Sequence, residues 1–340
     1  MADESYAVVV VSYNHAAILP ACLRAISRLQ PPPTAVVVVD NASTDASADL
    51  AAANPDGLPL TLVRNLSNVG FAAASNAGIA ATDTPWVLLL NPDCAPEPSY
   101  TARLLAAVHA RPEHDRIGCA VGKLLRAEGD DLVPTRTIDS AGMLVTPSGR
   151  HLDRGAGRGD DGRFDAPAWL FGATAAAALY RRTALDDIAY PSGERFAASF
   201  FAYREDAELA WRLQWRGWRC LYAPNAVASH RRGFRPEAGR QGHEAVNRHS
   251  VRNRFLLRLH CADLGWHLAC LPWWLVRDLL VIGGCLTVER GSLPALAELW
   301  RLRVDAAERR RWVMGRRSVP SRQVRRWFRR AGWTEEIVDR

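Results

Sequence analysis

Residues 87–94 read VLLLNPDC, an apolar run that stops at Asn91, Pro92 and the carboxylate of Asp93. Four apolar residues in succession are typical of a buried strand, and proline cannot continue a central strand. Asn-Pro-Asp by itself is the chemistry of an ordinary turn. The alternative is that this strand delivers a carboxylate to a ligand site, and the rest of the sequence has to decide between the two.

The first part of the chain repeats the same pattern. Three other short runs, rich in β-branched residues, precede the octapeptide: YAVVVVSY (6–13), AVVVVD (35–40) and LTLVRN (60–65). Ala-rich segments of helical length lie between the runs, at 16–28, 45–53 and 70–81. This alternation predicts βαβ units and a mainly parallel sheet. Because the strands are apolar throughout, we expect helices on both faces of the sheet.

The pattern changes in the second part of the chain. Residues 125–168 are rich in Gly, Asp and Arg, which predicts a long loop that orders when a ligand binds. Regular structure resumes at 169–185. The stretch REDAELAWRLQWRGW (204–218) has helical spacing and a natural stop at Gly217, and WRCLYAP (218–224) indicates a further strand.

Composition favours a large globular protein. The chain has 340 residues, of which 48% are hydrophobic, enough for about two domains. The seven cysteines form no CxxC pair, which argues against a disulfide framework or a zinc knuckle and favours a reducing compartment. The N-terminal MADESYAVVVVSY lacks a basic stretch before its apolar run, so it does not have the pattern of a secretory signal.

Charge is divided unevenly along the chain. Residues 231–340 contain 23 Arg and no Lys against 11 acidic residues, a net charge of +12, whereas the rest of the chain has a net charge of −5. Seven of the 12 tryptophans lie in the same C-terminal part. A basic, Trp-rich region indicates an anionic partner surface, either phospholipid head groups or nucleic acid.

One C-terminal stretch approaches the length of a membrane span. It is LGWHLACLPWWLVRDLLVIGGCLTV, residues 264–288. Arg277 and Asp278 lie in its middle, and each would cost about 2.5–3.5 kcal/mol at the centre of a bilayer. Pro272 interrupts the run further. These features favour an interfacial helix or a helical cap on the core over a full span.

Polar residues follow each of the four N-terminal strands. In an open parallel sheet, ligands bind beyond the carboxyl ends of the strands. Carboxylates, amides and exposed backbone suit the base, ribose and phosphates of a nucleotide, although helix capping explains any one of them. Walker A and GxGxxG motifs are absent, so the phosphate charge is most simply met by a divalent cation held on Asp93. The donor-nucleotide candidates are Ser12, Tyr13, Asn14, Asp40, Asn41, Asn68, Gly70, Asn76 and Asn91.

The order of these motifs resembles the family 2 glycosyltransferases of the GT-A fold, most of all their bacterial rhamnosyltransferase-like branch. The match runs over about residues 6–235 through VVSYN, VVDNASTD, NVGFAAASNAG, LLLNPD and the acidic pair in FFAYREDAELAWRLQWRGWR. The resemblance implies an α/β, Rossmann-like domain with a mainly parallel central sheet over 1–235, followed by a basic, helical, membrane-associating region over 236–340. It also implies that Ser12, Asn14 and Asp40 hold the base and ribose.

The resemblance assigns the remaining site residues. The metal-binding DXD element corresponds to Asn91-Pro92-Asp93, in which only the last residue is an acid, and His230 is implied to complete the shell of Mg²⁺ or Mn²⁺. Asp206 is implied as the catalytic base, although acids in a first helical turn also complement the helix dipole. The implied acceptor-side residues are Trp169, Gly172, Glu205 and Arg204, the last of which stands where many relatives have Gly.

The predicted activity is therefore inverting, metal-dependent sugar transfer in cell-envelope glycan synthesis, at the inner face of the cell membrane. A donor sugar linked to dTDP or UDP fits this activity, and rhamnose is the favoured sugar. A lipid-linked acceptor and a polysaccharide acceptor both fit. Two alternatives stay open at this point. A nucleotidyltransferase would require a Gly-rich basic loop after the first strand, where SYNHAA stands, and a nucleic-acid-binding protein would act through the Arg-rich stretch 308–330.

Overall fold

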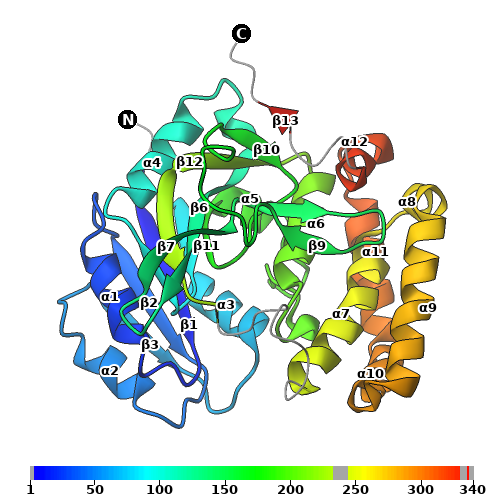
Figure 1. Ribbon diagram of the computed structural model, residues 1–340, viewed down its shortest axis with the longest axis horizontal. Coiled ribbons are helices and arrows are strands. Elements are labelled where there is room, and N and C mark those ends of the chain that lie inside the picture. The colour runs from blue at the N-terminus through cyan, green and yellow to red at the C-terminus, as the bar shows by residue number, and fades with distance from the viewer. Residues whose placement is uncertain (1–3, 233–243, 330–334, 337–340) are drawn as a thin grey trace.

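Strand–helix units build the N-terminal part of the computed structural model, which describes residues 4–232, 244–329 and 335–336 (Figure 1). In chain order the elements are β1 Tyr6–Ser12, α1 Leu19–Ser27, β2 Ala35–Asp40, α2 Ser47–Ala53, β3 Leu60–Arg64, α3 Phe71–Ala80 and β4 Trp86–Leu90. β1 pairs in parallel with β2 and β4, and β2 pairs in parallel with β3. The predicted βαβ units are confirmed.

Helices cover both faces of these strands. Successive side chains of a strand point to opposite faces, so neighbouring valines of β1 enter different cores. Val8 lies in one core with Leu23 of α1, and Val9 lies in the other with Ile79 of α3. Complete burial of one such side chain contributes about 1.5–3 kcal/mol. The continuous apolar strands are therefore stabilised from both sides, as the sequence predicts.

The second half of the chain makes the sheet a mixed one. It adds β5 Cys94–Pro96, α4 Tyr100–His109, β6 Ile117–Glu128, β10 Ala168–Leu170, β11 Ala177–Arg181, α5 Arg182–Asp187, α6 Glu205–Trp215 and β12 Arg219–His230. β11 lies between β4 and β6 and is antiparallel to both, whereas β6 and β12 are parallel. With β13, Glu335–Glu336, the strand order is β13-β10-β12-β6-β11-β4-β1-β2-β3.

The prediction of a long loop over 125–168 is wrong. This segment contains the end of β6 and three further strands: β7 Val133–Ser140, β8 Met143–Val145 and β9 His151–Asp153. β7 pairs with β6, and β8 forms a hairpin with β9. Gly129 and Gly149, with φ of 67° and 73°, lie in the turns between strands. β7 is mostly polar, and β8 and β9 have only three residues each, so a period of two cannot be recognised in the sequence.

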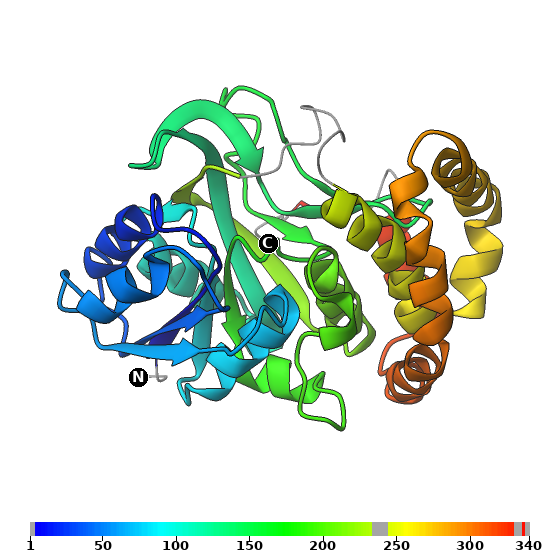
Figure 2. The same cartoon turned by 90° about the horizontal axis from the view of Figure 1, so that it is seen from below.

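The C-terminal part is a group of helices beside the sheet domain. They are α7 Glu244–Cys261, α8 Leu264–Ala269, α9 Leu271–Thr287, α10 Pro294–Arg301, α11 Arg303–Gly315 and α12 Ser321–Arg325. Figures 1 and 2 place them at the end of the molecule opposite β1–β3, with α9 on the outer side. The indole N–H of Trp215 in α6 donates to the carbonyl of Cys261 at 2.8 Å, which joins the two parts. The predicted boundary at 235/236 lies outside the described residues.

The apolar stretch 264–288 folds as α8 and α9 with a break between them. Within the described ranges, no single helix has both the length and the hydropathy that a membrane crossing requires. α9 and the segment Arg290–Arg301 meet both criteria only as a pair, and a bend of 112° separates them. Asp278, in the middle of α9, is buried and pairs with Arg258 of α7. The charge in the middle of α9 is thus directed inward.

Candidate functional site

Two unsatisfied polar groups lie at the carboxyl ends of β1 and β2. Ser12 is directly opposite Asp40 in the parallel register. Both side chains are buried, and the Ser12 hydroxyl and the Oδ1 atom of Asp40 have no hydrogen-bond partner among the described residues. The Oδ2 atom of Asp40 accepts from the N–H of Ser43 at 3.2 Å. Buried polar groups are normally paired, so these two atoms are suited to bind a ligand.

The loop after β1 is fixed against the loop after β2. The Oδ1 atom of Asn14 accepts from the N–H of Thr44 at 2.8 Å, and the N–H of Asn14 donates to the Ser43 hydroxyl at 3.0 Å. Asn14 has a φ of 57°, which its short polar side chain tolerates. Tyr13 beside it is 42% exposed, so its ring is available for stacking on a planar ligand.

The predicted asparagines after β2 and β3 hydrogen-bond one another. The Oδ1 atom of Asn41 accepts from Nδ2 of Asn65 at 3.0 Å, and Nδ2 of Asn41 donates to Oδ1 of Asn68 at 2.8 Å. Asn68 also accepts from the N–H of Gly70 at 3.0 Å. Gly70 has a φ of 85°, and a Cβ atom there would lie 2.5 Å from the carbonyl oxygen of Phe201. These residues shape the loop that approaches α6.

Asn76 and Asn91 have other partners. Nδ2 of Asn76 donates to the carbonyl of Phe196 at 2.7 Å, and its Oδ1 accepts from the N–H groups of Arg195 and Phe196 at 3.0 and 2.9 Å. Asn76 therefore joins α3 to the segment around Phe196 with its whole amide group. Asn91 continues β4, and its N–H donates to the carbonyl of Ala176 at 2.8 Å. Of the two, Asn91 is the one that follows a strand end.

Asp93, His230 and Asp139 form a buried polar centre. The Nε2 atom of His230 is 3.2 Å from Asp93, and its Nδ1 atom is 2.7 Å from Asp139. Antiparallel pairing of β5 with β12 sets this geometry, since it puts His230 opposite Cys94. Burial opposes the charge on His230, but the two carboxylates raise its pKa to about 9. Despite burial, His230 lowers the pKa of both Asp93 and Asp139.

The donor set of this centre fits a divalent cation. Ligand atoms of Asp93, Cys94 and His230 all lie within 4.8 Å of one another. Asp139 holds the Nδ1 side of the imidazole and leaves Nε2 directed at Asp93, which is how ligating histidines are usually oriented. Burial raises the pKa of the Cys94 thiol well above its usual value, so we expect it to remain protonated. Carboxylate and imidazole are ligands compatible with Mn²⁺.

A series of ion pairs leads from this centre toward α6. Arg232 contacts Asp139 at 3.1 Å and Asp153 of β9 at 2.7 Å. The charge of Asp153 is in turn one of the causes that raise the pKa of Asp206. The two predicted acids, Asp93 and Asp206, therefore border one connected group of charges. Asp139 and Asp153 were not predicted, because both lie in the segment interpreted as a loop.

Asp206 and Glu205 begin α6. The Oδ1 atom of Asp206 accepts from the N–H of Ala207 at 2.7 Å. Burial raises the pKa of Asp206 to about 6, although that hydrogen bond opposes the change. Burial and the neighbouring charge of Asp206 raise the pKa of Glu205 well above its usual value, and its Oε2 atom has no hydrogen-bond partner among the described residues. A carboxylate with a pKa near 6 suits general base catalysis.

The loop before Asp206 has a strained backbone. Phe201, Tyr203 and Arg204 have φ values of 63°, 71° and 74°, where residues other than glycine are uncommon. Nδ2 of Asn253 in α7 lies 2.7–2.8 Å from three carbonyl oxygens of this loop, those of Phe200, Ala202 and Tyr203. No sequence pattern pointed to Asn253, because it reaches the loop from a helix some fifty residues further along.

Trp169 and Gly172, predicted on the acceptor side, have packing contacts. Trp169 is 7% exposed and lies under the guanidinium of Arg219, 4.7 Å from the ring centre. A Cβ atom on Gly172 would lie 2.3 Å from that of Ala210 in α6. Gly172 thus allows its segment to pack closely against the helix that begins with Glu205 and Asp206.

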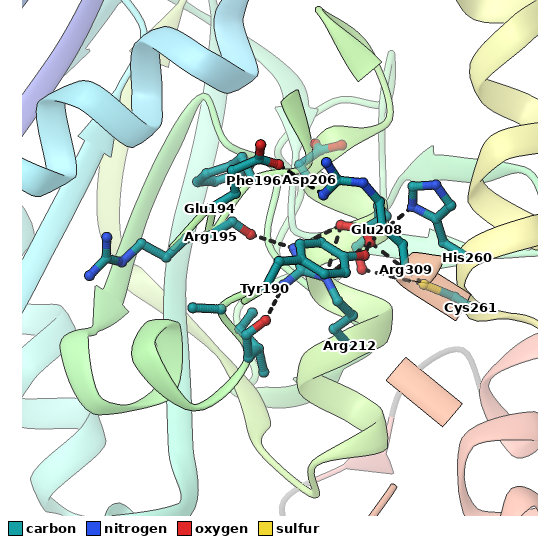
Figure 3. A network of polar contacts seen from close by, with 12 residues as sticks. Tyr190, Glu194, Arg195, Phe196, Asp206, Glu208, Arg212, His260, Cys261 and Arg309 are labelled. Atoms are coloured by element: carbon teal, nitrogen blue, oxygen red, sulfur yellow. Dashed lines mark hydrogen bonds and ion pairs between the residues drawn. The ribbon is translucent and has the colours of Figure 1, made fainter. Parts of the chain in front are cut away.

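A second buried ionic network holds α6 in place (Figure 3). Glu208 is paired with Arg212 at 2.8 Å, and Nδ1 of His260 in α7 lies 3.4 Å from Glu208. Tyr190 also donates to Glu208. Burial would raise the pKa of Glu208, but Arg212 and His260 lower it to about 2. Glu208 is therefore ionised, and the network joins α6 to α7 and to the segment that carries Tyr190.

Comparisons with known proteins agree with this architecture. The sequence profile of glycosyl transferase family 2 matches residues 7–189. N-acetylglucosaminyl-diphospho-decaprenol L-rhamnosyltransferase of Mycobacterium tuberculosis is 28% identical over 290 residues, which cover 79% of this chain and 88% of the relative. A PGL/p-HBAD biosynthesis glycosyltransferase of Mycobacterium bovis is 32% identical over 111 residues, 32% of this chain and 42% of that protein.

Solved structures share the fold. GalNAc-T7 with UDP, GalNAc and Mn²⁺ has a TM-score of 0.61 at 14% identity, and the similarity covers 92% of this chain and 56% of that one. Staphylococcus aureus TarS 1–349 with UDP-GlcNAc has a TM-score of 0.51 at 19% identity, covering 95% and 90%. The fold is an α/β GT-A fold. The chain is a transferase that belongs to glycosyl transferase family 2 and is similar to its rhamnosyltransferases.

Proposed function

We propose that this protein is an inverting, metal-dependent glycosyltransferase that moves a sugar from a nucleoside diphosphate to a hydroxyl of a lipid-linked acceptor. One observation carries the proposal: Asp93 and Asp206, more than a hundred positions apart, border the same series of charges through Asp139, Arg232 and Asp153. A cation site and a base with a raised pKa are the two functions that sugar transfer requires of the protein.

Asp206 acts as the general base. It takes the proton of the acceptor hydroxyl, whose oxygen forms a bond to the anomeric carbon from the face opposite the nucleotide. The bond between that carbon and the diphosphate oxygen breaks, and the electron pair leaves with the nucleoside diphosphate. A single displacement inverts the anomeric configuration and needs no covalent sugar–enzyme intermediate. Burial is the main cause of the raised pKa of Asp206, and the charge of Asp153 adds to it, which supports this role.

Asp93 and His230 hold the divalent cation, Mg²⁺ or Mn²⁺, and Asp139 orients the imidazole. When bound, the cation stabilises negative charge on the departing diphosphate. Ser12 and Asp40 offer an unsatisfied hydroxyl and an unsatisfied carboxylate oxygen to the base or ribose of the donor. The name of the mycobacterial relative supports rhamnose as the sugar and a lipid diphosphate as the acceptor. The nucleotide of the donor is proposed to be dTDP or UDP.

We also propose that the outer face of α8–α10 binds the membrane at its inner face, where lipid-linked acceptors are assembled. Asp278 points inward to Arg258, so the carboxylate of Asp278 does not lie on the opposite, outer face of α9. An exposed apolar face on a region with a net charge of +12 matches an anionic lipid surface. The exposed apolar side chains of this face are Leu264, Leu268, Leu271, Trp273, Leu275, Val276, Leu279, Leu280, Leu286, Val288 and Trp300.

The test is a transfer assay with the purified full-length chain. Nucleotide sugars linked to dTDP, UDP and GDP are supplied with Mn²⁺, Mg²⁺ or EDTA and a diphosphate-linked lipid sugar as acceptor. We expect transfer from one donor class, only with a divalent cation, and NMR of the product should show the inverted anomer. Transfer that persists in EDTA after dialysis, or a product with retained configuration, would contradict the mechanism.

A further inference from the structure

Arg254 of α7 is a buried cation for which the described part of the chain provides no ion pair. It is 4% exposed, and its Nε and Nη1 atoms have no hydrogen-bond partner among the residues that the structure describes. A buried charge without compensation is strongly destabilising, so a fold gains nothing in stability from it. Arg258, one turn further along the same helix, differs in that it pairs with Asp278. A ligand of negative charge would supply what Arg254 lacks.

Three more arginines are close enough for their charges to lower the pKa of Arg254, and we call Arg150, Arg204, Arg254 and Arg277 the arginine cluster. Arg204 reaches the carbonyl of Ser250 in α7 and Nδ1 of His151 in β9, both at 3.3 Å. Arg150 precedes His151 in the chain, and Arg277 precedes the inward-facing Asp278 of α9. The Nε atom of Arg277 is likewise buried without a hydrogen-bond partner among the described residues.

The cluster has an excess of positive charge. Burial is the largest cause that lowers the pKa of His151 to about 3, so His151 is neutral. The charges of four arginines add to it: Arg204, Arg232, Arg150 and Arg254. Burial and the charges of Arg204 and Arg277 likewise lower the pKa of Arg254 to about 9. The charge of Asp278 raises this pKa, but it offsets only part of the decrease. Two of the nearby carboxylates among the described residues pair with other arginines: Asp278 with Arg258 through Oδ2, and Asp153 with Arg232.

The cluster lies between the proposed base and the proposed membrane face. Arg204 directly precedes Glu205 and Asp206 and occupies the N-cap position of α6. His151 and Asp153 are two residues apart on β9 and so point to the same side, where His151 meets Arg204 and Asp153 affects the pKa of Asp206. At the other end, Arg277 belongs to α9, whose outer face is apolar.

We propose that the arginine cluster binds the diphosphate of a lipid-linked acceptor. Guanidinium groups bind phosphate oxygens through paired N–H donors, and several arginines can share the charge of one diphosphate. With the diphosphate there, the sugar attached to it extends toward Asp206 and the lipid toward α9. This inference rests on the proposed function, because it names the acceptor class of the same site. The diphosphate of the donor is the competing source of the same chemistry.

The test measures binding of farnesyl diphosphate to the full-length protein by titration calorimetry in EDTA, so that no cation mediates the contact. Farnesol, which lacks the phosphates, is the matched ligand. We expect farnesyl diphosphate to bind at least tenfold more tightly than farnesol. Arg254→Met should weaken binding of the diphosphate about tenfold to a hundredfold and leave farnesol unchanged, since a hydrogen bond to a charged group is lost. Saturating UDP should not displace farnesyl diphosphate.

Two variants separate binding from folding. Arg254→Met removes a buried charge that Asp278 compensates only in part, so its melting temperature should equal or exceed that of the parent. Arg254→Lys should restore part of the affinity. Arg311→Met, which removes an exposed arginine of α11, is the control and should bind like the parent. Equal affinity of the parent for both ligands, displacement by UDP, or unchanged binding by Arg254→Met would each overturn the inference. Failure of sugar transfer with every donor would instead refute the proposed function, because this binding assay does not require turnover.

Discussion

Replacing Asp206 by Asn tests the proposed base with almost no change in shape. The Oδ1 atom of Asp206 accepts from the N–H of Ala207 at 2.7 Å, and an amide oxygen can accept the same bond. A positioned general base contributes about 10²–10⁴-fold to the rate. We therefore expect kcat of Asp206→Asn to fall about 10²–10⁴-fold while KM for the donor stays within a factor of about two, since the asparagine no longer takes the proton.

The same substitution should stabilise the fold at pH 7. Burial raises the pKa of Asp206 from 3.8 to about 6, so folding favours its protonated form. The stability from this group is complete below pH 3.8 and is lost as the pH rises through about 6. Two pKa units correspond to about 3 kcal/mol. Because the side chain is partly exposed and interacts with Glu205, we expect asparagine to recover only about 1–2 kcal/mol.

Kinetics and urea unfolding of the two proteins from pH 5 to 8 measure both effects. The kcat/KM of the parent should fall about tenfold for each pH unit below about 6, as the base becomes protonated, whereas the residual rate of Asp206→Asn should lack this dependence. Asp115→Asn removes an exposed carboxylate and serves as the control. Normal turnover in Asp206→Asn, or a loss of stability at pH 7 relative to the parent, would refute the assignment of Asp206.

Three further predictions concern the supporting structure. Asp139→Asn leaves Nδ1 of His230 with a weaker partner and should raise the dissociation constant for Mn²⁺ about 10–100-fold. Calorimetry measures this constant, and an unchanged value would exclude His230 from the cation site. Arg212→Met leaves the charge of Glu208 buried and should lower the free energy of unfolding by about 3–5 kcal/mol. The added substitution Glu208→Gln should largely restore it. Urea titrations at pH 7 measure the loss, and unchanged stability in Arg212→Met would contradict the prediction. Leu279→Glu on the outer face of α9 should reduce flotation with anionic liposomes without lowering the melting temperature, and undiminished flotation would exclude this face as the membrane contact.

The local sequence predicts the elements whose pattern is strong. The strands around Val8, Val37 and Leu88 are apolar throughout, and α6 has clear helical spacing, so each could be identified from its own residues. Parallel strands place their carboxyl ends at one edge, which is why Ser12 and Asp40 could be predicted to lie together, and the structure places them side by side.

The same local patterns fail where strands are mostly polar or very short. β7 is mostly polar, and β8 and β9 have only three residues each, so none of them shows a clear period of two. The segment was therefore predicted to be a loop. This error concealed Asp139 and Asp153, the two carboxylates that connect the centre at His230 with Asp206.

The sequence by itself determined the α/β architecture and the acids and amides at the strand ends, because hydrophobic periodicity and turn chemistry act between near neighbours in the chain. Only the tertiary structure decided which charges meet. His230 and Asp139 are 91 positions apart, and Arg204 and Ser250 are 46 apart. Such contacts depend on strand register and helix packing, so no spacing along the chain encodes them. That Arg254 is buried with no hydrogen-bond partner for Nε and Nη1 among the described residues is a property of the folded molecule for the same reason.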